Sequence, residues 1–153
     1  MQRTLVILKP DAVTRGITWK IIDRLESKGL KLVACKMVML NEEILREHYS
    51  HLVDKPFFPD IVKFMTSAPV ILQVWEGVDA VDVVRLMTGV TNARQAQPGT
   101  IRGDFAMSVA RNVIHASESP EIAEQEIKRF FKEEEIFSYK RLDEDMLYEE
   151  DEK

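Results

Sequence analysis

The sequence has little cysteine and no long apolar run. Cys35 is the single cysteine among 153 residues, so no intrachain disulfide can form, which fits a reducing compartment. No apolar run is long enough to cross a bilayer, and the N-terminal residues enter a strand pattern without the apolar stretch of a signal peptide. From these absences we expect a cytoplasmic protein with no membrane partner.

The chain also lacks two glycine-rich loops that commonly bind nucleotides. It contains neither a Gly-x-x-x-x-Gly-Lys-Ser/Thr segment nor a Gly-x-Gly-x-x-Gly segment. The first cradles phosphates in P-loop proteins, and the second does so in dinucleotide-binding folds. Any phosphate-binding site in this protein must therefore use another arrangement.

Excess charge is absent from most of the chain. The net charge of −5 comes from residues 141–153, which hold seven acidic and two basic side chains. Residues 1–140 hold 19 of each, without the basic surplus of a nucleic-acid-binding domain. We expect a single domain over 1–140 and an acidic C-terminal extension over 141–153. In that extension Met146, Leu147 and Tyr148 either stay in solvent or pack onto a neighbouring surface.

The rest of the sequence alternates strand and helix patterns. The hydrophobic and charged contents, 45% and 31%, are typical of a folded domain. Apolar runs predict strands at 4–8, 30–40, 70–75 and around His115, with helices near 17–28, 41–47, 60–65, 77–87 and 120–131. This order predicts an α/β (α+β) fold, namely a ferredoxin-like β-α-β-β-α-β sandwich with a four-stranded antiparallel sheet and inserted short helices. Residues 88–111 are expected to form a loop long enough to suggest function.

A histidine stands where the last strand is expected to meet the last helix. His115 lies in an apolar run that ends at Ser117, and Pro120 marks a helix start. Backbone N–H groups at such a point favour anions, and a neutral imidazole is a competent nucleophile. Residues 85–111 carry four arginines against one acid, Asp104: Arg85, Arg94, Arg102 and Arg111. Together these features suggest phosphoryl chemistry on the imidazole.

Glu126 has two possible orientations in the expected helix. It falls within the apolar stripe, four residues after Ile122 and four before Phe130. If Glu126 faces inward, its buried carboxylate needs a partner and is suited to hold the tautomer of His115. If it lies at the edge of the stripe, it reaches water. The periodicity leaves both interpretations open.

Arg85 and Arg102 are the candidate phosphate ligands, because the planar guanidinium matches phosphate oxygens bidentately. A single surface arginine is more often simply solvated. Gly99 and Gly103 flank Arg102, and glycine lets the backbone approach a ligand closely. We expect Asp104 to lock this loop rather than to bind a metal.

Three further features are less specific. Lys9 follows the first strand, a common position for a lysine that faces a ligand. His48 and His51 resemble a metal-binding pair, but no third ligand is evident nearby, so we expect a solvated helix face. Phe57 and Phe58 belong to the core, unless one of them is exposed in the tight turn.

Four segments of the chain resemble those of nucleoside diphosphate kinases. They are 4–11 (Thr-Leu-Val-Ile-Leu-Lys-Pro-Asp), 55–58 (Lys-Pro-Phe-Phe), 98–105 (Pro-Gly-Thr-Ile-Arg-Gly-Asp-Phe) and 111–117 (Arg-Asn-Val-Ile-His-Ala-Ser). The resemblance runs from Arg3 to about Ile136, and the last segment is the family's signature around its phosphorylated histidine. It implies an enzyme that moves the γ-phosphoryl group of a nucleoside triphosphate to a nucleoside diphosphate, in a ping-pong cycle through a phosphohistidine.

The resemblance also implies the roles of individual residues. His115 matches the phosphorylated histidine, Glu126 the carboxylate that orients it, and Ser117 the serine beside this pair. The residues implied to contact phosphates are Lys9, Tyr49, Arg85, Thr91 and Arg102. Those implied to bind the ribose hydroxyls are Asn112 and Lys9. The base is implied to stack on Phe57, in a slot lined by Ile61 and Val109.

Family members use Mg²⁺ and assemble as hexamers or tetramers, so the resemblance implies a homo-oligomer. Because no dedicated carboxylate cage is evident, we expect Mg²⁺ to be held mainly by nucleotide phosphates and water, without protein ligands. Stacking on one aromatic ring predicts broad acceptance of ATP/ADP, GTP/GDP and other bases. The chain departs from the family pattern at Ala12, Ala93, Ala110 and Glu118, and of these Ala93 lies in the loop that helps subunits meet. The alternative is a regulatory binding protein on the same scaffold.

Overall fold

The computed structural model describes residues 1–152, which contain the expected four-stranded sheet. The strands are β1 (Gln2–Leu8), β2 (Lys31–Val38), β3 (Val70–Gly77) and β4 (Ile114–Ala116). They lie in the order β2-β3-β1-β4, and each neighbouring pair is antiparallel. The central position of β1 follows from its composition, since it is apolar on both faces from Leu5 to Leu8. The ferredoxin-like prediction is confirmed.

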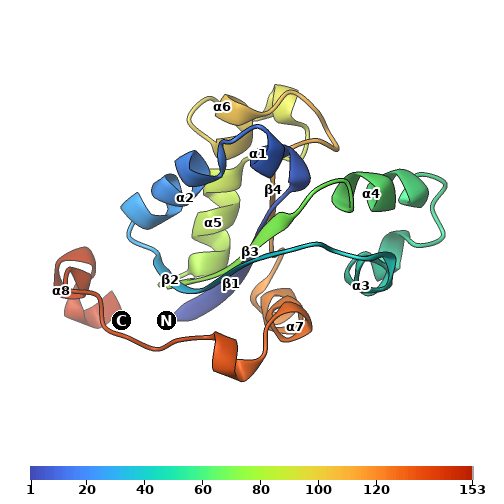
Figure 1. The fold of residues 1–153 in the computed structure, drawn as a ribbon. Coiled ribbons are helices and arrows are strands. Elements are labelled where there is room, and N and C mark those ends of the chain that lie inside the picture. Colours follow the sequence, from blue (N-terminus) through green and yellow to red (C-terminus); the bar gives the residue numbers. More distant parts are fainter. Residues whose placement is uncertain (153) are drawn as a thin grey trace.

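Helices cover both faces of the sheet (Figure 1). On one face Val6 and Leu8 of β1 pack with α1 (Pro10–Thr14), α2 (Thr18–Ser27), α5 (Ala80–Thr88) and α6 (Ile101–Phe105). On the other face Leu5 and Ile7 pack with α3 (Glu42–His48), α4 (Phe58–Met65) and α7 (Pro120–Phe130). Successive side chains of a strand point to opposite faces, so β1 contributes to two hydrophobic clusters.

The expectation of a plain loop over residues 88–111 is wrong in part. This segment holds the 3₁₀ turn Ala93–Gln95 and the helix α6. Thr100 is the N-cap of α6, where its hydroxyl oxygen accepts a hydrogen bond from the Gly103 N–H at 3.0 Å. Gly103 is the reason that this helix was not predicted, because glycine is unfavourable in a helix interior.

The C-terminal residues pack onto the sheet domain. Past the 3₁₀ turn Glu133–Glu135, the Phe137 N–H and the Tyr139 hydroxyl donate hydrogen bonds to carbonyls of β2, at 2.8 and 2.7 Å. Figure 1 shows the chain then reaching α8 (Glu144–Leu147), near the N-terminus, and a last 3₁₀ turn spans Glu150–Glu152. The Leu147 side chain packs beside Gly29, where a Cβ built on the glycine would lie 3.1 Å from Leu147 Cδ2. The Tyr148 hydroxyl accepts a hydrogen bond from the Val78 N–H at 3.4 Å. Of the two alternatives for this extension, packing is the one observed for Leu147 and Tyr148.

Within residues 1–152, no helix combines the length and apolar character needed to cross a membrane.

Candidate functional site

The strand that carries His115 is preceded by a strained turn. Val113 has φ +63°, a conformation that β-branched residues rarely adopt, and the Ile114 N–H donates to the Asn112 carbonyl across it. Two contacts hold the turn: the Lys9 N–H donates to the Val113 carbonyl at 2.9 Å, and Asp11 Oδ2 accepts from the Val113 N–H at 3.1 Å. Backbone strain of this kind persists only where the surroundings enforce it, often at functional sites.

Glu126 faces inward and contacts His115. Its side chain belongs to α7, is 3% exposed, and places Oε2 at 2.6 Å from His115 Nε2. The interpretation in which Glu126 reaches water is wrong. Burial by itself would raise the pKa of Glu126, but the hydrogen bond and electrostatic influence of His115 hold that pKa below its usual value. A carboxylate can only accept, so in the neutral ring the proton is on Nε2 and Nδ1 keeps its lone pair.

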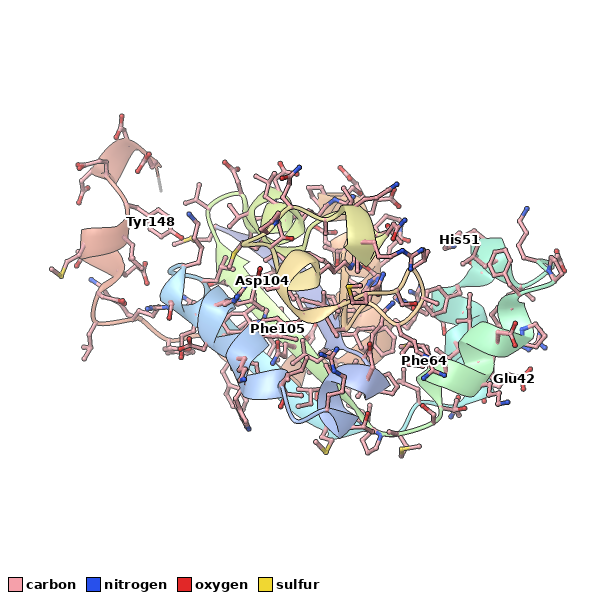
Figure 2. The ribbon with its side chains drawn as sticks, turned by 90° about the horizontal axis from the view of Figure 1, so that it is seen from above. Glu42, His51, Phe64, Asp104, Phe105 and Tyr148 are labelled. Carbon is pink, nitrogen blue, oxygen red and sulfur yellow. The ribbon has the colours of Figure 1, made fainter. Side chains whose placement is uncertain are left out.

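The interpretation of His48 and His51 as a solvated pair is wrong for His48. His51 is exposed, and Figure 2 shows it at the end of the molecule opposite Tyr148. His48 is only 8% exposed, and its Nδ1 lies 3.3 Å from Glu126 Oε2. Its position at the last residue of α3, facing the sheet, is visible only in three dimensions.

Lys9 and Asn112 form the next layer of the site. Lys9 Nζ donates to Asn112 Oδ1 at 2.7 Å, while Asn112 Nδ2 donates to the carbonyls of Thr91 and Val109 at 3.0 and 2.8 Å. Burial, reinforced by the nearby Arg102 charge, lowers the pKa of Lys9 to about 8. A partly desolvated ammonium of this kind has strong affinity for a phosphate that replaces its lost hydration.

Arg102 is anchored by backbone carbonyls. Its Nη1 donates to Gly89 at 3.0 Å and its Nη2 to Ile114 at 2.7 Å. Burial, with the neighbouring charge of Arg85, lowers the pKa of Arg102 to about 10. Burial also raises the pKa of Tyr49 to about 12, so its hydroxyl is a hydrogen-bond donor at neutral pH. Arg102 is thus held next to the strand that carries His115, and Tyr49 lies near enough to Arg102 for the two to influence each other's pKa.

Asp104 fixes α6 against α2, as expected for a loop-locking residue. Its carboxylate accepts from the Gly99 N–H at 2.9 Å and from Arg24 Nη2 at 2.6 Å. The Arg24 guanidinium also lies over the Phe105 ring, and Figure 2 shows Asp104 and Phe105 beside α2. The prediction that Asp104 locks this segment is confirmed.

The remaining candidate residues surround this centre at the surface. Phe57 and Val109 are 47% and 49% exposed, and Ile61 is half-buried on α4. The Arg111 guanidinium lies 5.6 Å from the Phe64 ring centre, which brings the segment after α6 close to α4. Arg85 and Thr91 are exposed. Ser117 differs, because its buried Oγ accepts from the Leu5 N–H at 3.1 Å and is thus tied to β1.

Asp11, His48 and Arg129 are the residues that reasoning from sequence missed. Asp11 supports the Val113 turn, and Arg129 Nη1 lies 3.2 Å from His48 Nδ1. For Asp11 the signal was its place directly after Lys9-Pro10. For His48 and Arg129 the helical periodicities of α3 and α7 carried no indication that the two side chains meet.

The fold and the site define an α+β domain in which a buried carboxylate is paired with an accessible histidine beside cationic side chains. The family model for nucleoside diphosphate kinase matches residues 2–136. A relative from Parabacteroides distasonis named nucleoside diphosphate kinase is 57% identical over 152 residues, covering 99% of each chain. One of the same name from Methanothermobacter thermautotrophicus is 53% identical, covering 98% of this chain and all of the relative.

Solved structures agree. A halophilic nucleoside diphosphate kinase from Halobacterium salinarum in complex with CDP aligns with TM-score 0.94 at 45% identity, covering 97% of this chain and 99% of that one. A Borrelia burgdorferi nucleoside-diphosphate kinase with bound vanadate and ADP aligns with TM-score 0.88 at 40% identity, covering 94% of each chain. The chain belongs to the nucleoside diphosphate kinase family and is a phosphotransferase.

Proposed function

We propose that this protein moves the γ-phosphoryl group of a nucleoside triphosphate to a nucleoside diphosphate through a phosphohistidine at Nδ1 of His115. The observation that carries the proposal is the 2.6 Å contact between Glu126 Oε2 and His115 Nε2. It keeps the Nδ1 lone pair free for attack on phosphorus, and the nearby negative charge stabilises the ring as it becomes positive.

In the first half-reaction, His115 Nδ1 forms a bond to the γ-phosphorus while the bond from that phosphorus to the bridging oxygen breaks. The nucleoside diphosphate leaves with the bond electrons. Lys9, Arg85 and Arg102 are proposed to balance the charge on the phosphoryl oxygens, with Tyr49 and Thr91 as hydrogen-bond donors. A second diphosphate then attacks the phosphohistidine from the same pocket and reverses these steps.

The nucleoside is proposed to bind between the start of α4 and the segment that follows α6. Phe57 would stack on the base, with Ile61 and Val109 along the slot. Lys9 and Asn112, already hydrogen-bonded to each other, would share the ribose hydroxyls. The CDP and ADP complexes of the relatives support acceptance of both pyrimidine and purine bases. Ser117 is proposed to support the histidine–glutamate pair through its anchor on β1.

Mg²⁺ is proposed to enter with the nucleotide and to have no ligands from the protein. Within residues 1–152, the grouping suited to a metal ion is His48, His115 and Glu126, whose single carboxylate already accepts from His115. Since Mg²⁺ prefers oxygen ligands, these residues do not fit it, and nucleotide phosphates and water are proposed to hold it. When bound, Mg²⁺ neutralises phosphate charge during transfer.

The proposal extends to the location, assembly and domain bounds of the enzyme. We place it in the cytoplasm as a homo-oligomer, hexamer or tetramer, with residues 1–140 as the enzymatic domain and the packed acidic extension as an addition. No role in nucleic-acid binding is proposed.

Intact-protein mass spectrometry tests the function directly. Purified protein is mixed with ATP and Mg²⁺, and GDP is added afterwards. The expected result is the gain of one acid-labile phosphoryl group that disappears when GTP forms. His115→Ala should bind nucleotide but gain no phosphoryl group. A folded wild-type protein that binds nucleotide without either product would support the regulatory binding protein instead.

A further inference from the structure

Arg129 does not pair with the acid nearest to it along α7. Glu126 precedes it by three residues, a spacing at which opposite charges on a helix normally attract. Instead, Arg129 Nη1 donates a hydrogen bond to His48 Nδ1 at 3.2 Å, and Arg129 Nε lies 3.2 Å from Glu47 Oε1. Both partners come from the C-terminal end of α3, so this helix supplies the acceptors for the guanidinium.

Ring contacts hold the His48 side chain in this position. Its ring packs edge-to-face against His115, Tyr49 and Phe130, at centroid distances of 4.7, 4.6 and 5.2 Å. Burial, then the electrostatic influence of His115, lowers the pKa of His48 to about 3, so the ring is neutral throughout the physiological range. A neutral His48 with its proton on Nε2 can accept a hydrogen bond from Arg129 at Nδ1 without adding a positive charge beside Glu126.

The same nitrogen contacts both charged groups. His48 Nδ1 lies 3.2 Å from the Arg129 guanidinium and 3.3 Å from Glu126 Oε2. Within residues 1–152, Glu126 Oε1 is buried and accepts no hydrogen bond at ordinary distance, while the nearby Ser117 side chain helps to lower the pKa of Glu126. An Arg129–Glu126 ion pair would use this oxygen, neutralise the carboxylate and weaken its hold on His115.

We propose that His48 is a positioning residue that intercepts Arg129 and so reserves the Glu126 carboxylate for His115. The inference rests on the proposed phosphohistidine mechanism. His48 acts through Glu126 and does not itself touch the phosphoryl group. Without this contact, the Glu126 carboxylate would interact with both Arg129 and His115. His115 Nδ1 would then be less nucleophilic, while the nucleotide pocket stayed intact.

Two substitutions of His48 distinguish the role of its Nδ1 from the packing role of its ring. His48→Phe keeps an aromatic ring for the edge-to-face contacts and removes the acceptor for Arg129. His48→Asn keeps an amide oxygen near the place of Nδ1 and removes the ring. We expect His48→Phe to slow single-turnover phosphorylation of His115 at saturating ATP by roughly 10-fold, below the 10²–10⁴ typical of a lost proton-transfer group. Nucleotide affinity should stay unchanged, and His48→Asn should be faster than His48→Phe.

The decisive variant adds Arg129→Met to His48→Phe. Met keeps an unbranched side chain without charge, so Glu126 is again left to His115, and the double variant should recover most of the lost rate. In ¹⁵N spectra, His48→Phe should reduce the population of the His115 tautomer protonated at Nε2, and the double variant should restore it. Circular dichroism and nucleotide titration establish that each variant is folded.

The outcomes are distinct. A His48→Phe protein as fast as wild type, or a double variant as slow as His48→Phe, would refute the interception. The comparison of His48→Asn with His48→Phe decides the matter if the double variant does not fold. If wild-type protein itself forms no phosphohistidine, the proposed function fails rather than this inference.

Discussion

Glu126 and His115 meet through Oε2 and Nε2 at 2.6 Å, with the carboxylate almost completely buried and the imidazole at the surface of the site. The buried partner fixes the tautomer, and the accessible one is left with a free nitrogen. This division of roles follows from the helix that carries Glu126 lying under the strand that carries His115.

Removing the carboxylate should slow phosphoryl transfer without weakening nucleotide binding. We expect Glu126→Ala to lower the rate of His115 phosphorylation by roughly 10-fold to 1000-fold, as for loss of an orienting group. Glu126→Gln retains a hydrogen-bond acceptor without charge, and its rate should fall between those of Glu126→Ala and wild type. Rapid-quench single turnovers with ATP and Mg²⁺ give the rates. Glu126→Ala as fast as wild type would return the residue to a purely structural role.

The Val113 turn gives a second prediction, centred on Asp11. Asp11→Ala removes the acceptor of the Val113 N–H, so a residue held at φ +63° loses one of its two restraints. A buried donor left unpaired costs about 1–3 kcal/mol, and we expect that loss in urea unfolding. We also expect slower phosphorylation of His115, two residues further on. Asp11→Asn keeps an acceptor oxygen and serves as the control; if both variants behave alike, the turn does not depend on this hydrogen bond.

The pH dependence of nucleotide binding tests Lys9. Its pKa in the free protein is lowered to about 8, and a bound phosphate would raise it again. Lys9 is thus charged below pH 8, and above it a proton must be taken up on binding. Affinity should be level from pH 6.5 to 7.5 and then fall by up to about tenfold per pH unit. Calorimetric titration with ADP provides the measurement. Lys9→Met should bind more weakly with no such decline, and a wild-type curve as level as the variant's would contradict the assignment.

The elements differ in how far sequence alone could predict them. Helical periodicity put Glu126 near the apolar stripe of its helix but left its orientation open, and the family resemblance is what assigned it to His115. His48, Arg129 and Asp11 could not be placed, because each acts through a partner 81 or 102 residues away, and period and capping carry no such information. The helix α6 was missed because its packing against α2 overrides the low helix propensity of glycine.

Gly103 shows how closely that helix is packed, and it provides the last prediction. A Cβ on Gly103 would collide with the Gln97 carbonyl oxygen and the Thr100 hydroxyl, the group that caps α6. Gly103→Ala should therefore lower the free energy of unfolding by roughly 1–3 kcal/mol and, by shifting Arg102, also slow phosphoryl transfer. Gly16→Ala is the matched control: Gly16 has φ +65° but open space for a Cβ, so it should cost about 1 kcal/mol of backbone strain and leave transfer unchanged. Urea unfolding and a coupled ATP–GDP assay measure both effects. If Gly103→Ala were as active as Gly16→Ala, α6 would have room to adjust, and Arg102 would not depend on the close approach of Gly103 to Gln97.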